Sequence, residues 1–367
     1  MTKDNLSQKE GRNGMMSQTN SPFLSRAECN IMRGLAILII VINNFTHLLK
    51  GVYQDNEYIY SWNNVLGFLN NLSHPDHLLP FNLISFYCPY GVILFIFLSG
   101  YGLTLKYEKG NGQSVTHKSF VVNHYNKLFL MQLKGLAIFL TITLIFKSNV
   151  ILEGFPLLLQ ALLVGNLNPY QQIHPGPYWF FGMIMEMYVI YRFAIYKRNE
   201  YVILTLIVIS LIAMGLVPPT SGPMSYFRIN CFLAILPFCM GVLAARHLSF
   251  NFLSIHKTGI CLVWFAISFI FLTLCKFNFY SWLFLPIFVI ATAVTIVKVL
   301  NKVRIFDNIF GWLGTMSGVL FVVHPSVRAI LITRANQSGD YYSAVIYYLL
   351  ITLGLCIMLK PVFSSKK

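Results

Sequence analysis

The sequence predicts an all-α protein that crosses a membrane about ten times, and three observations support this fold class. Of the 367 residues, 56% are hydrophobic and only 11% are charged, whereas a soluble globular protein carries about 25% charged residues. The apolar residues gather in long stretches, and the basic residues fall mainly in alternate connections between them. The composition therefore excludes a soluble enzyme, a disordered protein and a nucleic-acid binder.

The expected membrane spans follow from length, because a helical span needs about 20 mostly apolar residues. They are 32–49, 83–105, 128–147, 178–197, 201–217, 228–246, 258–275, 279–299, 310–331 and 342–361. The stretch 150–165 is also apolar, but it is short and contains Glu153 and Pro156. We expect a re-entrant or interfacial helix there, since a full span would reverse every later segment.

The basic residues test this topology. With the N-terminus inside, 21 of the 27 Lys and Arg residues fall on the inside and 6 on the outside, as the positive-inside rule requires. The net charge of +15 is then mainly a topology signal. We expect a disordered polar tail at 1–27, a membrane domain at 28–362 and a second tail at 363–367, with both tails cytoplasmic. No signal-peptide core precedes Arg33.

Cysteine and histidine patterns predict neither a disulfide framework nor a metal site. The seven Cys include no CxxC pair, and six lie in apolar runs, where a free Cys behaves as a small hydrophobe. His74, Asp76 and His77 in the outer loop 51–81 lack a fourth ligand at a diagnostic spacing. The Tyr, Trp and Asn residues of this loop suit sugar stacking, and a lid packed on the helices is an equally good interpretation.

Polar residues inside a predicted span are costly and mark candidate functional sites. The first span contains Arg33, Asn43, Asn44 and His47. Arg33 would bind phosphate groups or extend to the interface as an anchor. Asn43 and His47 are four residues apart and share a helix face. His47 would serve as a general base or as an ordinary interfacial histidine.

Further candidates occur in later spans. The segment 120–134, with His124 and Lys127, is a basic flank or a contact for an anionic ligand. Glu186 lies near the middle of a span, which indicates a functional or site-organising role. Ser317 and His324 are seven residues apart on one face, where His324 is either functional or a buried structural histidine.

Five short sequence motifs occur in a characteristic order. They are Met32–Ile37 (MRGLAI), Phe95–Tyr101 (FIFLSGY), the basic segment 120–134, Tyr178–Phe181 (YWFF) with Tyr188, and Gly314–Gly318 (GTMSG) followed by Phe321–Pro325 (FVVHP). Over residues 28–360 the chain resembles the membrane acyltransferase type 3 family, bacterial proteins that O-acylate surface and exported glycans. The resemblance implies a bundle of about ten helices, an acyl-CoA co-substrate from the cytoplasm, a glycan acceptor, and a place in the bacterial cytoplasmic (inner) membrane.

The resemblance also implies roles for individual residues. Arg33 matches the family's helix-1 arginine, near CoA or the acyl carbonyl. The family's histidine ten or eleven residues later is replaced by Asn43 and Asn44, and the nearest histidine is His47. The family's Arg-x-x-Arg pair aligns with His124 and Lys127. The remaining assignments are donor binding by Lys106 and an acceptor-side or supporting role for Glu186, Trp179, Ser317 and His324.

Acetyl transfer to a polysaccharide hydroxyl is therefore the leading interpretation, with no bound cofactor or metal. A transporter or flippase for a glycan or its lipid-linked precursor would also use Arg, Glu and His inside the membrane, but the sequence shows no internal repeat. An inactive relative is the third interpretation, because the helix-1 histidine and the basic pair are altered.

Overall fold

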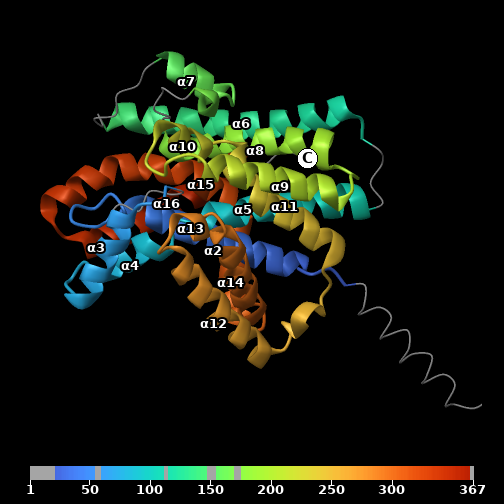
Figure 1. Ribbon diagram of the computed structural model, residues 1–367. Helices are drawn as coiled ribbons and strands as arrows, with labels where there is room; N and C mark the ends of the chain where they lie inside the picture. The colour runs from blue at the N-terminus through green and yellow to red at the C-terminus, as the bar shows by residue number, and fades with distance from the viewer. Residues whose placement is uncertain (1–20, 54–58, 111–114, 147–153, 169–174, 364–367) are drawn as a thin grey trace, which may run out of the picture.

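The computed structural model describes residues 21–53, 59–110, 115–146, 154–168 and 175–363. Within these ranges the chain folds almost wholly into helices and contains no β-strand, only an isolated bridge between Pro22 and Ser249. Figure 1 shows the long helices packed side by side in one bundle. The predicted all-α membrane fold is confirmed.

Ten of the described helical segments overlap the ten predicted spans. Six are long and apolar enough to cross a membrane: α2 (Arg26–Thr46), α4 to η1 (Leu79–Lys109), α6 (His117–Ile145), α12 (Thr258–Cys275), α15 (Arg304–Ser338) and α16 (Tyr341–Phe363). The others are shorter apolar helices: α8 (Trp179–Ile190) with its extension η4 (Tyr191–Ile195), α9 (Glu200–Gly215), α11 (Cys231–His247) and α14 (Leu285–Leu300).

Helix α6 begins at His117, well before the predicted start at residue 128. The Thr116 side chain accepts a hydrogen bond from the backbone N–H of Ser119 and caps the helix. The first turns of α6 are polar and basic, so they are helical without being part of the apolar stretch. Hydropathy locates the lipid-embedded part of a helix, whereas capping residues determine where the helix begins.

The predicted short helix in 150–165 is α7 (Gly154–Ala161). Its eight residues span only about 12 Å, which is too short to cross a membrane. It lies at the edge of the bundle beside α6 (Figure 1). The outer loop also contains a helix, α3 (Trp62–Ser73), which precedes α4 (Leu79–Tyr87).

Two glycine crossings hold the centre of the bundle together. A Cβ added to Gly34 of α2 would lie 2.0 Å from the carbonyl oxygen of Phe310, and one added to Gly314 of α15 would lie 2.0 Å from that of Asn30. Gly100 of α5 (Gly91–Thr104) and Gly241 of α11 repeat this reciprocal pattern. Small residues at such crossings let backbones approach closely, which is how membrane helices associate.

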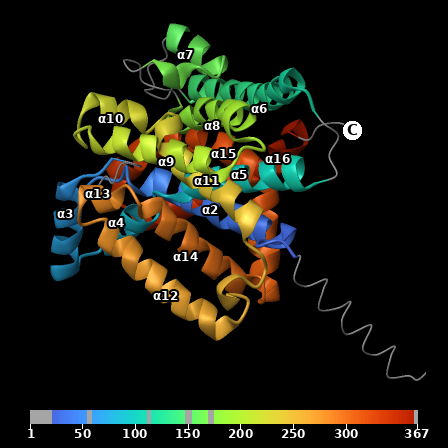
Figure 2. The same cartoon turned by 45° about the vertical axis from the view of Figure 1, so that its right-hand side comes forward.

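Polar contacts join the helices at each end of the bundle. At the N-terminal end, where α2 begins, Lys298 of α14 contacts the Glu28 carboxylate at 2.9 Å and the Phe23 carbonyl at 2.7 Å. At the opposite end, Asn336 of α15 accepts a hydrogen bond from the Lys50 backbone N–H at 2.8 Å. Because consecutive spans alternate in direction, α2 and α15 run the same way. Figure 2 shows α12 and α14 forming a hairpin beside this core.

Candidate active site

The two central helices meet at a polar contact deep in the bundle. Nη1 of Arg328 in α15 donates to Oδ1 of Asn44 at 3.0 Å and to the Asn44 carbonyl at 3.3 Å. The Asn44 amide in turn donates to the Ile40 carbonyl at 3.0 Å. Sequence reasoning counted Arg328 only as a basic residue near the end of a span. Its position four residues after His324, on the same helix face, was the signal that could have identified it.

His47 ends α2 one turn beyond this contact. Its Nδ1 lies 2.5 Å from the Asn43 carbonyl oxygen. A carbonyl only accepts hydrogen bonds, so Nδ1 carries the proton and Nε2 keeps its lone pair. Arg328 also acts electrostatically on His47. The predicted base candidate is thus held in the tautomer that a general base requires.

Two fully buried side chains near this contact have unused hydrogen-bonding atoms. Within the described ranges, neither Oδ1 nor Nδ2 of Asn43 has a partner, and Nε2 of His324 has none. Nδ1 of His324 lies 3.0 Å from the Leu320 carbonyl, so Nε2 is again the lone-pair nitrogen. Arg328 acts electrostatically on His324 as it does on His47. Leaving buried polar atoms unsatisfied costs free energy, and a bound polar substrate would relieve that cost.

A cationic cluster lies toward the N-terminal end of the bundle. Lys106 and Lys127 both act electrostatically on His124, so the three predicted donor-binding residues come together. The His124 ring lies 4.9 Å from the ring of Tyr188 in α8. Arg33 acts electrostatically on Tyr188. In the sequence Tyr188 stands out only as part of a motif, whereas in the structure its ring lies against His124.

The cationic cluster adjoins two π-helical turns. The turn η1 (Leu105–Lys109) contains Lys106 and ends span two, and η4 ends span four. The hydroxyl of Tyr196, which follows η4, donates to the Tyr107 carbonyl of η1 at 3.4 Å. Short π-helical segments are rare and occur frequently at functional sites.

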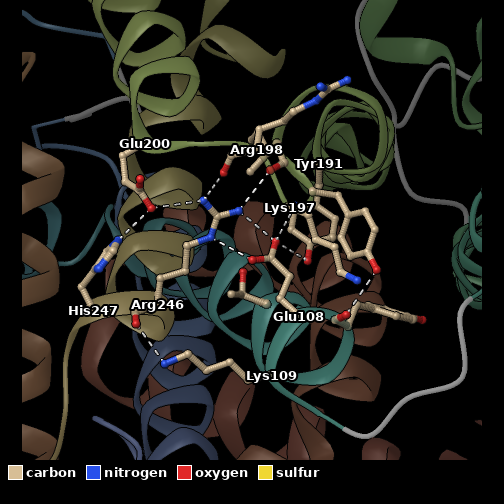
Figure 3. A network of polar contacts seen from close by, with 12 residues as sticks. Glu108, Lys109, Tyr191, Lys197, Arg198, Glu200, Arg246 and His247 are labelled. Carbon is tan, nitrogen blue, oxygen red and sulfur yellow. Dashed lines mark hydrogen bonds and ion pairs between the residues drawn. The ribbon is translucent and has the colours of Figure 1, made fainter.

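An ion-pair network links the two π-helical turns η1 and η4, as Figure 3 shows. Nε of Arg246 lies 2.8 Å from Oε2 of Glu108, and Nη2 lies 3.0 Å from Oε1. The Tyr191 hydroxyl donates to Glu108 at 3.2 Å. The Arg246 guanidinium also donates hydrogen bonds to the backbone carbonyls of Arg198 and Ile195. Glu108 and Arg246 were not predicted as site residues, since nothing local indicates that residues 138 positions apart form a pair.

Glu186 lies in a different network. Its Oε2 accepts from the Cys231 backbone N–H at 2.9 Å, and its Oε1 accepts from Asn166. Asn166 also donates to Asn230 Oδ1 at 2.8 Å. The carboxylate therefore stabilises the N-terminus of α11, where a negative charge is favourable. These hydrogen bonds reach the loop helix η2 (Gly165–Leu167) and α11, and not α2 or α15.

The other predicted residues occupy buried positions near the central helices. Trp179 begins α8, and Ser317 lies in α15 two turns before His324. Among the described residues, no group of three or more His, Cys, Asp or Glu side chains is placed to hold a metal ion.

The described chain is thus a helical bundle of the kind that spans a membrane, with a cationic cluster near one end and buried polar groups that lack partners among the described residues. Residues 26–360 match the family model described as an acyltransferase domain. The chain therefore belongs to the acyltransferase 3 family and is a membrane acyltransferase. No curated protein and no solved structure matches it.

Proposed function

We propose that this acyltransferase moves an acetyl group from acetyl-CoA to a hydroxyl of an exported or cell-surface polysaccharide. The observation that carries the proposal is the arrangement along α2. Arg33 acts electrostatically on Tyr188, whose ring contacts His124 of the cationic cluster, while Asn44 is hydrogen-bonded to Arg328 and His47 follows one turn later. Arg33 and Asn44 are eleven residues apart, about 16 Å along the helix, and nearly on one face.

The cationic cluster supplies the donor site in this proposal. Coenzyme A carries several phosphate charges, and Lys and Arg side chains bind phosphate through charge-assisted hydrogen bonds. Arg33, Lys106 and Lys127 provide positive charge, and His124 adds a ring nitrogen. The thioester end of the donor then points along α2 toward the buried polar cluster. An anionic donor from the cytosol requires the N-terminal end of the bundle to face the cytoplasm of a bacterial inner membrane, with both chain termini there.

The proposed reaction begins with proton transfer from the acceptor hydroxyl to Nε2 of His47. The resulting alkoxide attacks the thioester carbonyl carbon and forms a new C–O bond. The developing oxyanion needs preorganised donors, which the unpaired amide of Asn43 supplies. The C–S bond then breaks, and the leaving CoA thiolate takes the proton from the His47 imidazolium. His324 contributes a second unpaired ring nitrogen on the acceptor side, and Arg328 orients Asn44.

The direct test uses purified protein with acetyl-CoA and an acetyl-free oligosaccharide of the producing cell's exported polysaccharide. Release of free CoA thiol that depends on both substrates, together with an acetyl ester on the sugar, supports the proposal. The companion measurement compares the acetyl content of the exported polysaccharide in cells with and without the protein. An unchanged acetyl content and no binding of acetyl-CoA at millimolar concentration would overturn it.

A further inference from the structure

A large apolar cavity lies away from both polar clusters, between α11, α12 and α14. Its volume is about 590 Å³, which falls in the range of about 300–1,000 Å³ typical of small-molecule sites. The described residues that line it include Phe97, Met240, Trp264, Phe288 and Ala291. Figure 2 shows the α12–α14 hairpin at the edge of the bundle, and the cavity is lined by residues of this hairpin and of α11.

The cavity wall has little to offer a polar ligand. Its two hydroxyl side chains are already paired: Ser268 donates to the Phe265 carbonyl at 3.0 Å, and Thr295 donates to the Ala291 carbonyl at 3.1 Å. Ordered water in a cavity needs two to four polar partners. The remaining wall residues in α12 and α14 are aliphatic or aromatic. The chemistry of the wall therefore selects a hydrocarbon chain over water or a sugar.

Lipid reaches this hairpin because α12 is exposed along most of its length. Its exposed apolar side chains are Ile260, Leu262, Val263, Ile267, Phe269, Ile270, Phe271 and Leu274. Trp264 and Ile267 also line the cavity. In a membrane the medium around such a helix is bilayer hydrocarbon.

One end of the cavity adjoins the ion-pair network of Arg246. His247 lines the cavity, and its Nε2 lies 3.1 Å from Oε1 of Glu200. The side chains labelled in Figure 3 include two carboxylates, Glu108 and Glu200, and four permanent cations, Lys109, Lys197, Arg198 and Arg246. Leu248, Phe252 and Leu253 line the same end. An apolar cavity whose one end meets, through His247, a network with more cationic than anionic side chains suits a lipid with an anionic headgroup.

We propose that this cavity binds one acyl chain of an anionic phospholipid from the surrounding bilayer, with the phosphate beside His247. The site lies on the α11 side of α5, whereas the proposed donor residues contact α6 and α8. The lipid would fill the space between the hairpin and the core, and so hold α12 and α14 against α11. The inference does not depend on which group the enzyme transfers.

The test counts lipids on the purified full-length protein by native mass spectrometry after mild delipidation, with phosphatidylglycerol and phosphatidylcholine as probes. We expect one tightly held phosphatidylglycerol, lost in Ala291→Phe because the new ring fills the cavity. The matched control is Leu350→Phe on the exposed face of α16, which should keep the lipid. Phosphatidylcholine should be held less tightly.

A second measurement does not depend on the Ala291→Phe variant. Phosphatidylglycerol brominated on its acyl chain should quench the fluorescence of Trp264 more strongly than that of Trp312. The variants Trp264→Phe and Trp312→Phe identify the contribution of each tryptophan. Retention of the lipid by Ala291→Phe, or equal quenching at the two tryptophans, would overturn the proposal. Binding of palmitoyl-CoA in the cavity, with no phospholipid bound there, would instead assign the cavity to a long-chain acyl donor, and this outcome also rejects the proposal.

Discussion

Arg328 of α15 binds both the side-chain oxygen and the backbone carbonyl of Asn44 in α2, although the two residues are 284 positions apart in the chain. This contact joins the two helices that also cross at Gly34 and Gly314. The resemblance aligns Asn43 and Asn44 with a histidine of the family, and in this structure Asn44 is held by an arginine. The proposed chemistry then passes to His47, one turn away.

The Asn44–Arg328 contact should be required for turnover. In Arg328→Gln the charge-assisted hydrogen bonds to Asn44 are lost, while Asn44 stays buried. The loss of these hydrogen bonds costs about 1.5–3 kcal/mol. We expect kcat to fall by about 10- to 100-fold, measured as CoA thiol release. Arg334→Gln, an exposed arginine of the same helix, is the control. Equal activity of the two variants would show that the contact is not needed.

Removal of His47 should abolish acyl transfer. General-base catalysis contributes about 10²- to 10⁴-fold, so His47→Ala should lose most of its activity while its membrane expression and monodispersity stay unchanged. His324→Ala is the matched comparison, because its Nε2 is also unpaired among the described residues. If His324→Ala alone were inactive and His47→Ala retained full rate, the base would be His324.

The cationic cluster should affect the KM for acetyl-CoA more than kcat. Lys127 is exposed on α6, and an exposed charge contact contributes about 0.2–1 kcal/mol. Lys127→Gln should therefore raise this KM by at most about fivefold, and the effect should shrink with added salt. Lys118→Gln, nine residues earlier and on the opposite face of α6, serves as the control. An unchanged KM in Lys127→Gln would remove this residue from the donor site.

The glycine crossing should tolerate no side chain. In Gly34→Ala the added methyl group would lie 2.0 Å from the Phe310 carbonyl oxygen, so α2 and α15 must separate. We expect a clear fall in thermal stability in detergent and loss of activity. Gly354→Ala in α16 meets no atom within 4 Å; it should be neutral or more stable by about 0.5–1 kcal/mol. Similar melting temperatures for the two variants would contradict the crossing.

Loss of the Glu108–Arg246 ion pair should lower thermal stability more than loss of the exposed contact between Glu200 and Arg246. The two side chains are only 9% and 10% exposed, and removal of one partner of a buried pair costs about 3–5 kcal/mol. Glu108→Gln should lower the melting temperature and, because Lys106 lies in the same π turn, weaken acetyl-CoA binding. Glu200 is 47% exposed and 3.8 Å from Arg246, so Glu200→Gln should have a much smaller effect. Equal melting temperatures of Glu108→Gln and Glu200→Gln would refute this ranking.

The local part of the fold was predictable from hydropathy. Each predicted span overlaps a helix, since a run of apolar residues is a property of neighbouring positions in the chain. Boundaries were less predictable, as at His117 of α6 and in α15, which extends from Arg304 to Ser338. Polar turns that continue a helix beyond its apolar stretch carry no hydropathy signal.

The candidate site was predictable only in part. Lys106 and Lys127 both act electrostatically on His124, because the end of span two and the start of α6 lie on the same side of the bundle. Glu186 was recognised as unusual from its position in a span, but its hydrogen bond to the Cys231 N–H depends on where another helix begins. Arg328 and Glu108 were missed, since a residue's partner on a distant helix leaves no local pattern.

The sequence by itself determined that this protein is an all-α membrane protein of the acyltransferase 3 family, because span length, charge asymmetry and ordered motifs are all written along the chain. Only the tertiary structure decided which polar residues meet. The reciprocal glycine approaches at Gly34 and Gly314 bring α2 and α15 close enough for Arg328 to reach Asn44. That pairing depends on how helices cross in three dimensions, which the order of residues in either helix alone does not specify.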